Sequence, residues 1–224
     1  GMDEPLGHKI GNALEVYEAI ETLNGQGPKD LVEVTIEIGA HLLLDAQIET
    51  DFEKAKIRLQ EALQNGTAYQ KFLELVKAQG GDLDSLNDPS LLLSKKTVEV
   101  LSVKEGFVMD IDALGIGKAA MRLGAGRETK EDKVLLDVGL DLHKKIGSYV
   151  KKGESIATLY VQDKGIEEAK QLILSSLTIG KEEKHIVNLG IPVEINKVKY
   201  LEDWLVKQHL DIPKNNEKEI TDEE

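Results

Sequence analysis

The sequence predicts an α+β fold in which a helical segment precedes a segment of short strands. Between residues 12 and 79, apolar side chains recur at helical spacing in four runs, which glycine or polar residues separate. After a loop over residues 80–94, which contains Pro89, apolar residues alternate with polar ones. Closely spaced glycines then divide residues 145–160 into short apolar pieces. We therefore expect helices first and a strand-rich domain after them.

Each of the four predicted helices begins at a residue that can cap a helix N-terminus. Asn12, with Glu15 as its reciprocal partner, opens the first helix, and Asp30 caps the second. The segments 50–53 and 67–70 open the third and fourth helices as capping boxes. No strand is apparent among these runs, so the helices either pack together or cover a sheet supplied elsewhere. The expected helices cover about residues 12–23, 30–42, 52–64 and 67–79.

The second segment is predicted to contain short strands and two helices. Strands over residues 97–103 and 106–111 are joined by a short turn at Lys104 and Glu105. The run over residues 145–160 resembles the second half of biotinyl and lipoyl carrier domains, but its tip lacks the lysine that such carriers modify. We retain the architecture alone, with strands folded back in a barrel-sandwich or hammerhead arrangement. The other elements are a helix over 113–123, a strand over 134–142 and a helix over 165–177.

The loop after the fourth helix predicts a domain boundary. Residues 1–86 then form the helical segment, and residues 95–180 form the second domain. Residues 181–224 are unassigned. The charged stretch from Pro213 onward is expected to be disordered, because it has almost no apolar side chains to bury.

Composition limits the classes of function. The chain has 41 acidic and 28 basic residues, a formal net charge of −13, and only 4% aromatic residues. This balance argues against a nucleic-acid partner, which needs clustered Lys and Arg or aromatic stacking platforms. No apolar run is long enough to span a bilayer, so no membrane partner is expected. Cysteine is absent, which excludes disulfides and thiolate metal sites and fits a cytoplasmic protein.

The N-terminal loop is a candidate cation site. Pro5 fixes a turn, and Gly7 and Gly11 allow backbone conformations that other residues avoid. Such a loop turns carbonyl groups outward, and the carboxylate of Glu18 follows in the first helix. Carbonyls and a carboxylate are the hard oxygen ligands that alkali and alkaline-earth cations prefer. The alternative is a glycine-rich loop before a surface helix, and spacing alone favours it because short motifs are weak signals.

Other candidate groups carry weaker signals. Residues 124–127 could bind an anion through backbone amides and the Arg127 guanidinium, or could form a tight turn that requires glycine. No serine nucleophile elbow, Walker loop or strand-coupled Gly-x-Gly-x-x-Gly is present. Five histidines are too dispersed to suggest a zinc cluster and are expected to be ordinary buried or surface residues: His8, His41, His143, His185 and His209.

The most specific patterns lie in three stretches, each made of two short segments. They are Met2-Asp3-Glu4-Pro5-Leu6-Gly7 with Gly11-Asn12-Ala13-Leu14-Glu15-Val16, Leu114-Gly115-Ile116-Gly117 with Leu123-Gly124-Ala125-Gly126-Arg127, and Leu142-His143-Lys144-Lys145-Ile146-Gly147 with Lys152-Gly153-Glu154. The segment Ala78-Gln79-Gly80-Gly81-Asp82 supports them. Together they resemble the pyrimidine-nucleoside phosphorylases, a family that includes thymidine phosphorylase. The resemblance covers about residues 2–177. It implies the helical segment of a phosphorylase α/β domain followed by the family's C-terminal α/β-hammerhead (barrel-sandwich-like) domain.

The resemblance also implies an activity and a cofactor. The activity is a pentosyl transfer, in which phosphate attacks the anomeric carbon of a pyrimidine nucleoside and releases the base and a pentose 1-phosphate. The cofactor is a structural, potassium-like monovalent cation, whose ligands here would be the carbonyls of Leu6 and Lys9 and the carboxylate of Glu18. Lys9 stands where the family has a small residue, and its ammonium group could weaken cation binding. Further ligands belong to the family's first half, so the isolated chain can leave the site empty.

By this resemblance the sequence corresponds to the C-terminal half of the enzyme. The Gly-rich phosphate loop and the residues that grip the pyrimidine are not found, so no catalytic residue is assigned and the isolated chain is expected to be inactive. Phosphate and a pyrimidine nucleoside are the expected partners of the full enzyme, which is expected to be a homodimer. The alternative hypothesis is a non-catalytic binding or scaffolding protein descended from the phosphorylase.

Overall fold

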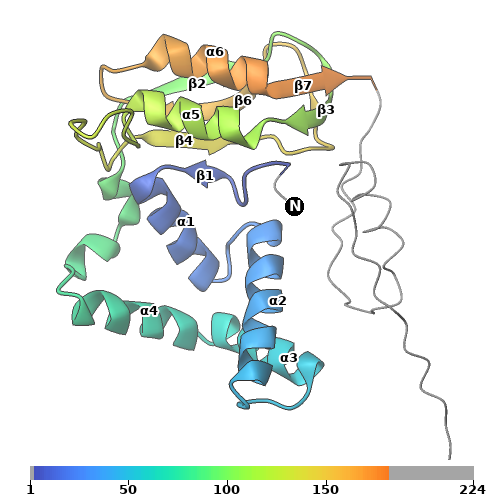
Figure 1. Cartoon of the computed structure of the whole chain (residues 1–224), viewed down its shortest axis with the longest axis vertical. Helices are drawn as coiled ribbons and strands as arrows, with labels where there is room; N and C mark the ends of the chain where they lie inside the picture. The colour runs from blue at the N-terminus through green and yellow to red at the C-terminus, as the bar shows by residue number, and fades with distance from the viewer. Residues whose placement is uncertain (1–2, 182–224) are drawn as a thin grey trace, which may run out of the picture. The chain divides into compact units, whose positions relative to one another are not determined.

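The computed structural model describes residues 3–181, in which helices come first and two small antiparallel sheets follow (Figure 1). The expectations for residues 182–224, including those for His185 and His209, lie outside the described residues. Within residues 3–181, no helix combines the length and the apolar character needed to cross a bilayer. The helices are α1 (Asn12–Leu23), α2 (Lys29–Asp45), α3 (Phe52–Gln64), α4 (Thr67–Ala78), α5 (Ala113–Leu123) and α6 (Ile166–Ser176), with short 3₁₀ turns η1 (Asp84–Leu86) and η2 (Pro89–Leu92). The strands are β1 (Lys9–Ile10), β2 (Thr97–Leu101), β3 (Gly106–Ile111), β4 (Gly139–Leu142), β5 (Tyr149–Val150), β6 (Ser155–Tyr160) and β7 (Leu177–Gly180).

The first four helices form where the apolar runs predict them, but the capping residues differ. Gly11 precedes α1, and its N–H donates to Oε1 of Glu15 at 3.2 Å. The predicted reciprocal bond to Glu15 is therefore made by Gly11 rather than by Asn12. The side chain of Asn12 instead donates to the carbonyl of Ala125 at 2.8 Å, which links α1 to the loop after α5.

The residues that precede the other three helices also differ from the predicted caps. Pro28 precedes α2, and Asp30 lies inside the first turn. At α3 the cap is Asp51, which accepts the N–H of Lys54 at 2.9 Å. Gly66 precedes α4 in a left-handed conformation. The cap lies two residues from the predicted one at α2 and one residue from it at α3 and α4, which is the usual precision of such boundaries.

The strand-rich part consists of two sheets, with strand orders β1-β4-β6-β2 and β5-β3-β7. The predicted connection between residues 97–103 and 106–111 does not produce a hairpin. β2 pairs with β6, whereas β3 pairs with β5 and β7 in the other sheet. The predicted strand over residues 134–142 is limited to β4, and neither β1 nor β7 is predicted from sequence. The chain thus folds back between two sheets, as a barrel-sandwich or hammerhead arrangement requires.

The main core lies between these sheets and the helix pair α5 and α6, which run side by side (Figure 1). Ile116 and Leu123 of α5 and Ile173 of α6 are fully buried. Burying one such side chain on folding contributes about 1.5–3 kcal/mol to the free energy of unfolding. Gly165 starts α6 against the carbonyl of Arg122, with φ +67°, so a larger residue there would push the two helices apart. The edge strand β1 joins this strand-rich core to the helical segment.

The helical segment buries much less apolar surface. α2 packs against α3, yet α4 has no buried residue. Three apolar side chains, spaced four residues apart on α2, are exposed: Val34 by 38%, Ile38 by 56% and Leu42 by 61%. We call these three residues the α2 stripe. In the described part of the chain, nothing covers it.

Candidate functional site

The N-terminal loop leads into β1, which forms the edge of the four-stranded sheet. Lys9 pairs with Asp141 and Ile10 with Leu140 in β4. The N–H of Leu142 donates to the carbonyl of His8 at 2.8 Å, so His8 takes part in the hydrogen bonds of the ladder. In an antiparallel pair, the polar groups of the next residue point to the other side of the strand. The N–H and the carbonyl of Lys9 therefore face away from β4.

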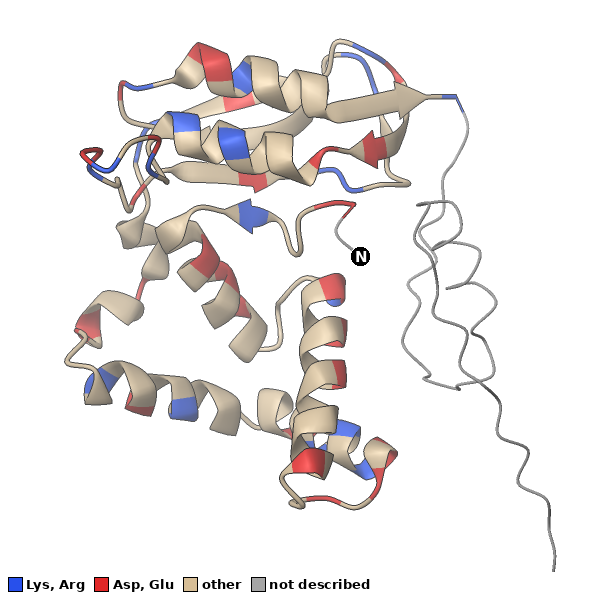
Figure 2. Ribbon diagram, viewed as in Figure 1, with Lys and Arg blue, Asp and Glu red and all other residues tan. Residues whose placement is uncertain are grey.

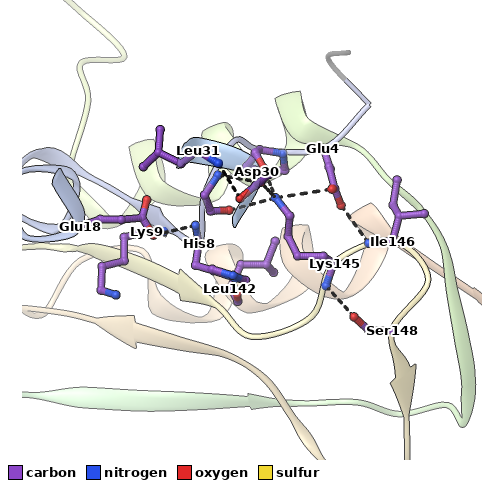
Figure 3. Close-up of polar contacts among 12 residues, drawn as sticks. Glu4, His8, Lys9, Glu18, Asp30, Leu31, Leu142, Lys145, Ile146 and Ser148 are labelled. Carbon is purple, nitrogen blue, oxygen red and sulfur yellow. Dashed lines mark hydrogen bonds and ion pairs between the residues drawn. The ribbon is translucent and has the colours of Figure 1, made fainter. Parts of the chain in front are cut away.

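Glu18 of α1 lies on that outer side of β1. Its Oε1 accepts the N–H of His8 at 2.8 Å and the N–H of Lys9 at 3.2 Å, and the residue is only 4% exposed (Figure 3). Burial raises the pKa of the Glu18 carboxyl, because it disfavours the charged form; the two N–H groups and the charge of Lys9 oppose this shift. Among residues 3–181, no basic side chain forms an ion pair with Glu18.

Gly7 makes this close approach possible. Its φ is +67°, and a Cβ at this position would clash with the carboxylate of Glu18. Both the left-handed backbone and the lack of a side chain are required here. The preceding residue, Leu6, has a side chain that is 52% exposed. The loop thus brings Leu6 and Lys9 to the neighbourhood of one buried carboxylate.

The side chain of Lys9 does not occupy this site. Its Nζ lies 3.0 Å from Oε2 of Glu21 and 3.7 Å from Oδ2 of Asp141, and 5.2 Å from the centre of the Tyr17 ring. Burial alone would lower the pKa of this ammonium, but the bond to Glu21 and the charge of Asp141 raise it overall. The ammonium is therefore held as a charged group by two other carboxylates. The charge of Lys9 still acts on the Glu18 carboxylate, so the predicted weakening of cation binding by Lys9 stays a prediction.

The groups gathered here are oxygen ligands that could hold a hard cation. They are a buried carboxylate without an ion-pair partner and the carbonyl of Lys9, which strand geometry turns away from β4. No group of three or more His, Asp or Glu side chains in the described part of the chain could hold a metal ion by itself. Leu6, Lys9 and Glu18 as cation ligands remain a prediction.

A second charged group holds the same loop from the other side, and sequence reasoning missed it. Nζ of Lys145, in the connection between β4 and β5, donates to the carbonyls of Pro5 and, at 3.0 Å, of Gly7. It also lies 3.1 Å from Oδ2 of Asp30 and 3.6 Å from Oε1 of Glu4 (Figure 3). Pro5 and Gly7 are 140 and 138 residues from Lys145, and Asp30 lies on α2, so no local pattern could reveal the cluster.

The carboxylates around Lys145 are themselves tied to the backbone. Oε2 of Glu4 accepts the N–H of Ile146 at 2.8 Å, and Oδ2 of Asp30 accepts the N–H of Gly7 at 3.1 Å. Burial alone would raise the pKa of Asp30, but the hydrogen bond and charge of Lys145 lower it overall. Asp30 therefore serves as an anchor of the loop rather than as the predicted cap of α2.

The other candidate groups have ordinary structural roles. Gly124 ends α5 in a left-handed conformation, and its N–H and that of Ala125 donate to carbonyls of that helix. Residues 124–127 thus form the tight turn and leave these two amides unavailable to an anion. The described histidines do not cluster. His8 contacts the carbonyl of Leu142 at 2.8 Å, and His143 lies beside Ser155 and Thr158.

Comparisons with known proteins show which family this chain resembles. The sequence profile of the Pyrimidine nucleoside phosphorylase C-terminal domain matches residues 107–180. A Pyrimidine-nucleoside phosphorylase from Geobacillus stearothermophilus is 45% identical over 179 residues, which are 80% of this chain and 41% of the relative. The protein of the same name from Bacillus subtilis is 42% identical over 184 residues, or 82% of this chain and 42% of the relative. That from Staphylococcus aureus is 40% identical over 198 residues, or 88% of this chain and 44% of the relative.

The chain spans less than half the length of the curated relatives it matches. Within that span the similarity includes the C-terminal domain that the profile describes. The resemblance found in the sequence is therefore confirmed: this chain is similar to pyrimidine-nucleoside phosphorylases over 80–88% of its own length, and residues 107–180 match the C-terminal domain of that family.

Proposed function

We propose that this chain provides the C-terminal part of a pyrimidine-nucleoside phosphorylase, which converts a pyrimidine nucleoside and phosphate into the free base and a pentose 1-phosphate. The observation that carries the proposal is 40–45% identity to proteins of that name over 80–88% of this chain. In this reaction a phosphate oxygen bonds to the anomeric carbon as the carbon–nitrogen bond to the base breaks. Such a reaction needs a cationic phosphate cradle and donors aimed at the charge that develops on the base.

The residues for that cradle would come from a part of the enzyme outside this span. The relatives extend well beyond the 41–44% of their length that this chain covers. In this proposal the 224-residue chain alone has no phosphorolytic activity. The full enzyme would bind phosphate and nucleoside and would be a homodimer.

The contribution of this chain would be one side of the cation site. The carbonyls of Leu6 and Lys9 and the carboxylate of Glu18 would hold a potassium-like ion. A bound cation would supply the positive charge that the buried Glu18 carboxylate lacks. The chain's own part is to place that carboxylate beside β1 through the N–H groups of His8 and Lys9.

The test is reconstitution of activity. The 224-residue chain is assayed for phosphorolysis of thymidine and uridine alone, and again as a fusion behind the part of the Geobacillus stearothermophilus relative that it does not cover. We expect no activity from the chain alone and measurable activity from the fusion. Activity of the chain alone would contradict the inactivity, and a well-folded but inactive fusion would contradict the proposed function.

A second candidate function is a non-catalytic binding or scaffolding protein. The α2 stripe favours it, because its three apolar side chains are 38–61% exposed and could contact another protein. The inactive fusion is the result expected for this candidate. The sequence upstream of Met2 in the native gene also separates the two, since a scaffolding protein needs no catalytic half.

A further inference from the structure

The ammonium group of Lys145 joins three segments that are distant in sequence. It contacts the carbonyls of Pro5 and Gly7 in the N-terminal loop, the carboxylate of Asp30 at the start of α2, and the carboxylate of Glu4. The Lys145 side chain is only 15% exposed. An ammonium has three N–H donors, so two carbonyls and a carboxylate are enough to satisfy it.

The Gly7–His8 peptide unit lies between this ammonium and the carboxylate of Glu18. Its carbonyl accepts from Nζ of Lys145 at 3.0 Å, and its N–H donates to Oε1 of Glu18 at 2.8 Å. No cis peptide bond occurs in the described residues, so the carbonyl and the N–H of this planar unit point in opposite directions. One rigid group is thus held by a cation at one end and by an anion at the other.

We propose that Lys145 is a positioning residue for Glu18 and thereby for the cation site. By fixing the Gly7 carbonyl, Lys145 aims the N–H of His8 at Glu18, and the N–H of Lys9 follows along the same strand. Without the ammonium, Gly7 can rotate about its two backbone torsions, because it has no side chain that would hinder rotation. The importance of Glu18 for binding a cation rests on the proposed function, whereas the coupling between Lys145 and Glu18 rests on these contacts alone.

The neighbouring lysine offers a matched control. Nζ of Lys144 donates to Oε1 of Glu154 at 2.6 Å and to the carbonyl of Tyr149 at 3.2 Å, and its side chain is 18% exposed. Lys144→Met therefore removes the same charge at similar burial from the same connection. It does not touch the N-terminal loop.

The experiment is amide hydrogen exchange, measured residue by residue by NMR on the 224-residue chain in a buffer whose only added salt is choline chloride. In Lys145→Met, the amides of His8 and Lys9 should exchange about ten to a hundred times faster than in the unchanged chain, the range expected for losing a hydrogen bond to a charged group. The amide of Leu142, which bonds to His8 in the ladder, reports whether β1 is still paired with β4. In Lys144→Met, the His8 and Lys9 amides should exchange at the original rate.

The role of Lys145 would be overturned if the amides of His8 and Lys9 exchanged at the same rate in Lys145→Met as in Lys144→Met. It would also be overturned if the Leu142 amide in Lys145→Met were accelerated as much as the amides of His8 and Lys9. Lys145→Arg keeps the charge and should restore part of the protection. If Lys145→Met does not fold, Lys145→Gln serves in its place, because it also removes the charge that holds the Gly7 carbonyl but keeps a polar end on the side chain. A smaller acceleration at the same two amides is expected there, and no acceleration overturns the proposal.

Potassium titration separates this inference from the proposed cation site. Melting of the unchanged chain is followed in potassium chloride and in choline chloride at equal ionic strength. If potassium gives no extra stabilisation, the cation site on this chain is contradicted, while hydrogen exchange still decides the role of Lys145. If potassium binds, its affinity should fall about tenfold in Lys145→Met and stay the same in Lys144→Met, which corresponds to about 1.4 kcal/mol.

Discussion

Replacing Gly7 by alanine tests the packing of the N-terminal loop against Glu18. Gly7 has φ +67°, and an added Cβ would meet the Glu18 carboxylate. Alanine therefore strains the backbone and also pushes Glu18 away from the N–H groups of His8 and Lys9. The matched control is Gly25→Ala, since Gly25 has φ +77° and nothing lies within 4 Å of its added Cβ.

The two effects have separable magnitudes. A left-handed conformation costs an L-residue about 1–2 kcal/mol, and this cost applies to both variants. Loss of a hydrogen bond to a charged group costs about 1.5–3 kcal/mol and applies only to Gly7→Ala. With at least one such bond lost, the free energy of unfolding of Gly7→Ala should be lower by about 2.5–5 kcal/mol, against about 1–2 kcal/mol for Gly25→Ala.

The assay is urea unfolding at neutral pH, followed by far-UV circular dichroism. The difference in midpoint between the two variants, multiplied by a common slope, gives the contribution of the Glu18 contact. Equal midpoints for Gly7→Ala and Gly25→Ala would refute the reasoning, because they would mean that Glu18 loses nothing when Gly7 gains a side chain.

Three further predictions concern pH and the exposed helix face. Burial raises the pKa of Glu18, so the contribution of this residue to the free energy of unfolding is present below the ordinary carboxyl pKa and is lost as pH rises through the folded pKa. Glu18→Gln should remove this loss, which urea unfolding at a series of pH values measures. The pKa of Asp30 is lowered, so its contribution is present above the ordinary value and is lost as pH falls through the folded pKa; Asp30→Asn should make acid unfolding less steep. Ile38→Glu, in the middle of the α2 stripe, should reduce self-association in sedimentation velocity while changing stability by no more than about 0.5 kcal/mol. An unchanged sedimentation profile in a chain that does self-associate would exclude the α2 stripe as the contact.

The sequence predicts helices better than strands here because helix signals are local. The bounds of α1 and α5 match the runs over residues 12–23 and 113–123. The missing hairpin has a non-local cause. Ser102 exchanges hydrogen bonds with Gly153 and Glu154 in the turn before β6, so the chain leaves β2 toward another sheet. Strand partners at such separations cannot be read from alternation alone.

The same limit applies to the candidate site. Leu6, Lys9 and Glu18 come from a resemblance between sequences. The structure joins the N–H of Lys9 to Glu18, while the role of all three as cation ligands stays a prediction. Lys145 belongs to a motif that also carries the resemblance, yet nothing in the motif states what its ammonium contacts. Figure 2 shows several acidic residues along α1 and α2. Their pattern in the sequence does not indicate that Asp30 forms an ion pair with Lys145 of the strand-rich part.

The proposed monovalent cation would meet an excess of negative charge at this loop. Glu4, Asp30 and Glu18 contribute three negative charges, and Lys145 contributes one positive charge. Lys145 is shared by Glu4 and Asp30, while the ammonium of Lys9 is engaged by Glu21 and Asp141. Glu18 is thus the carboxylate that the loop leaves without an ion pair among the described residues, and burial makes its negative charge costly. A single added positive charge beside Glu18, such as that of the proposed cation, would offset that cost.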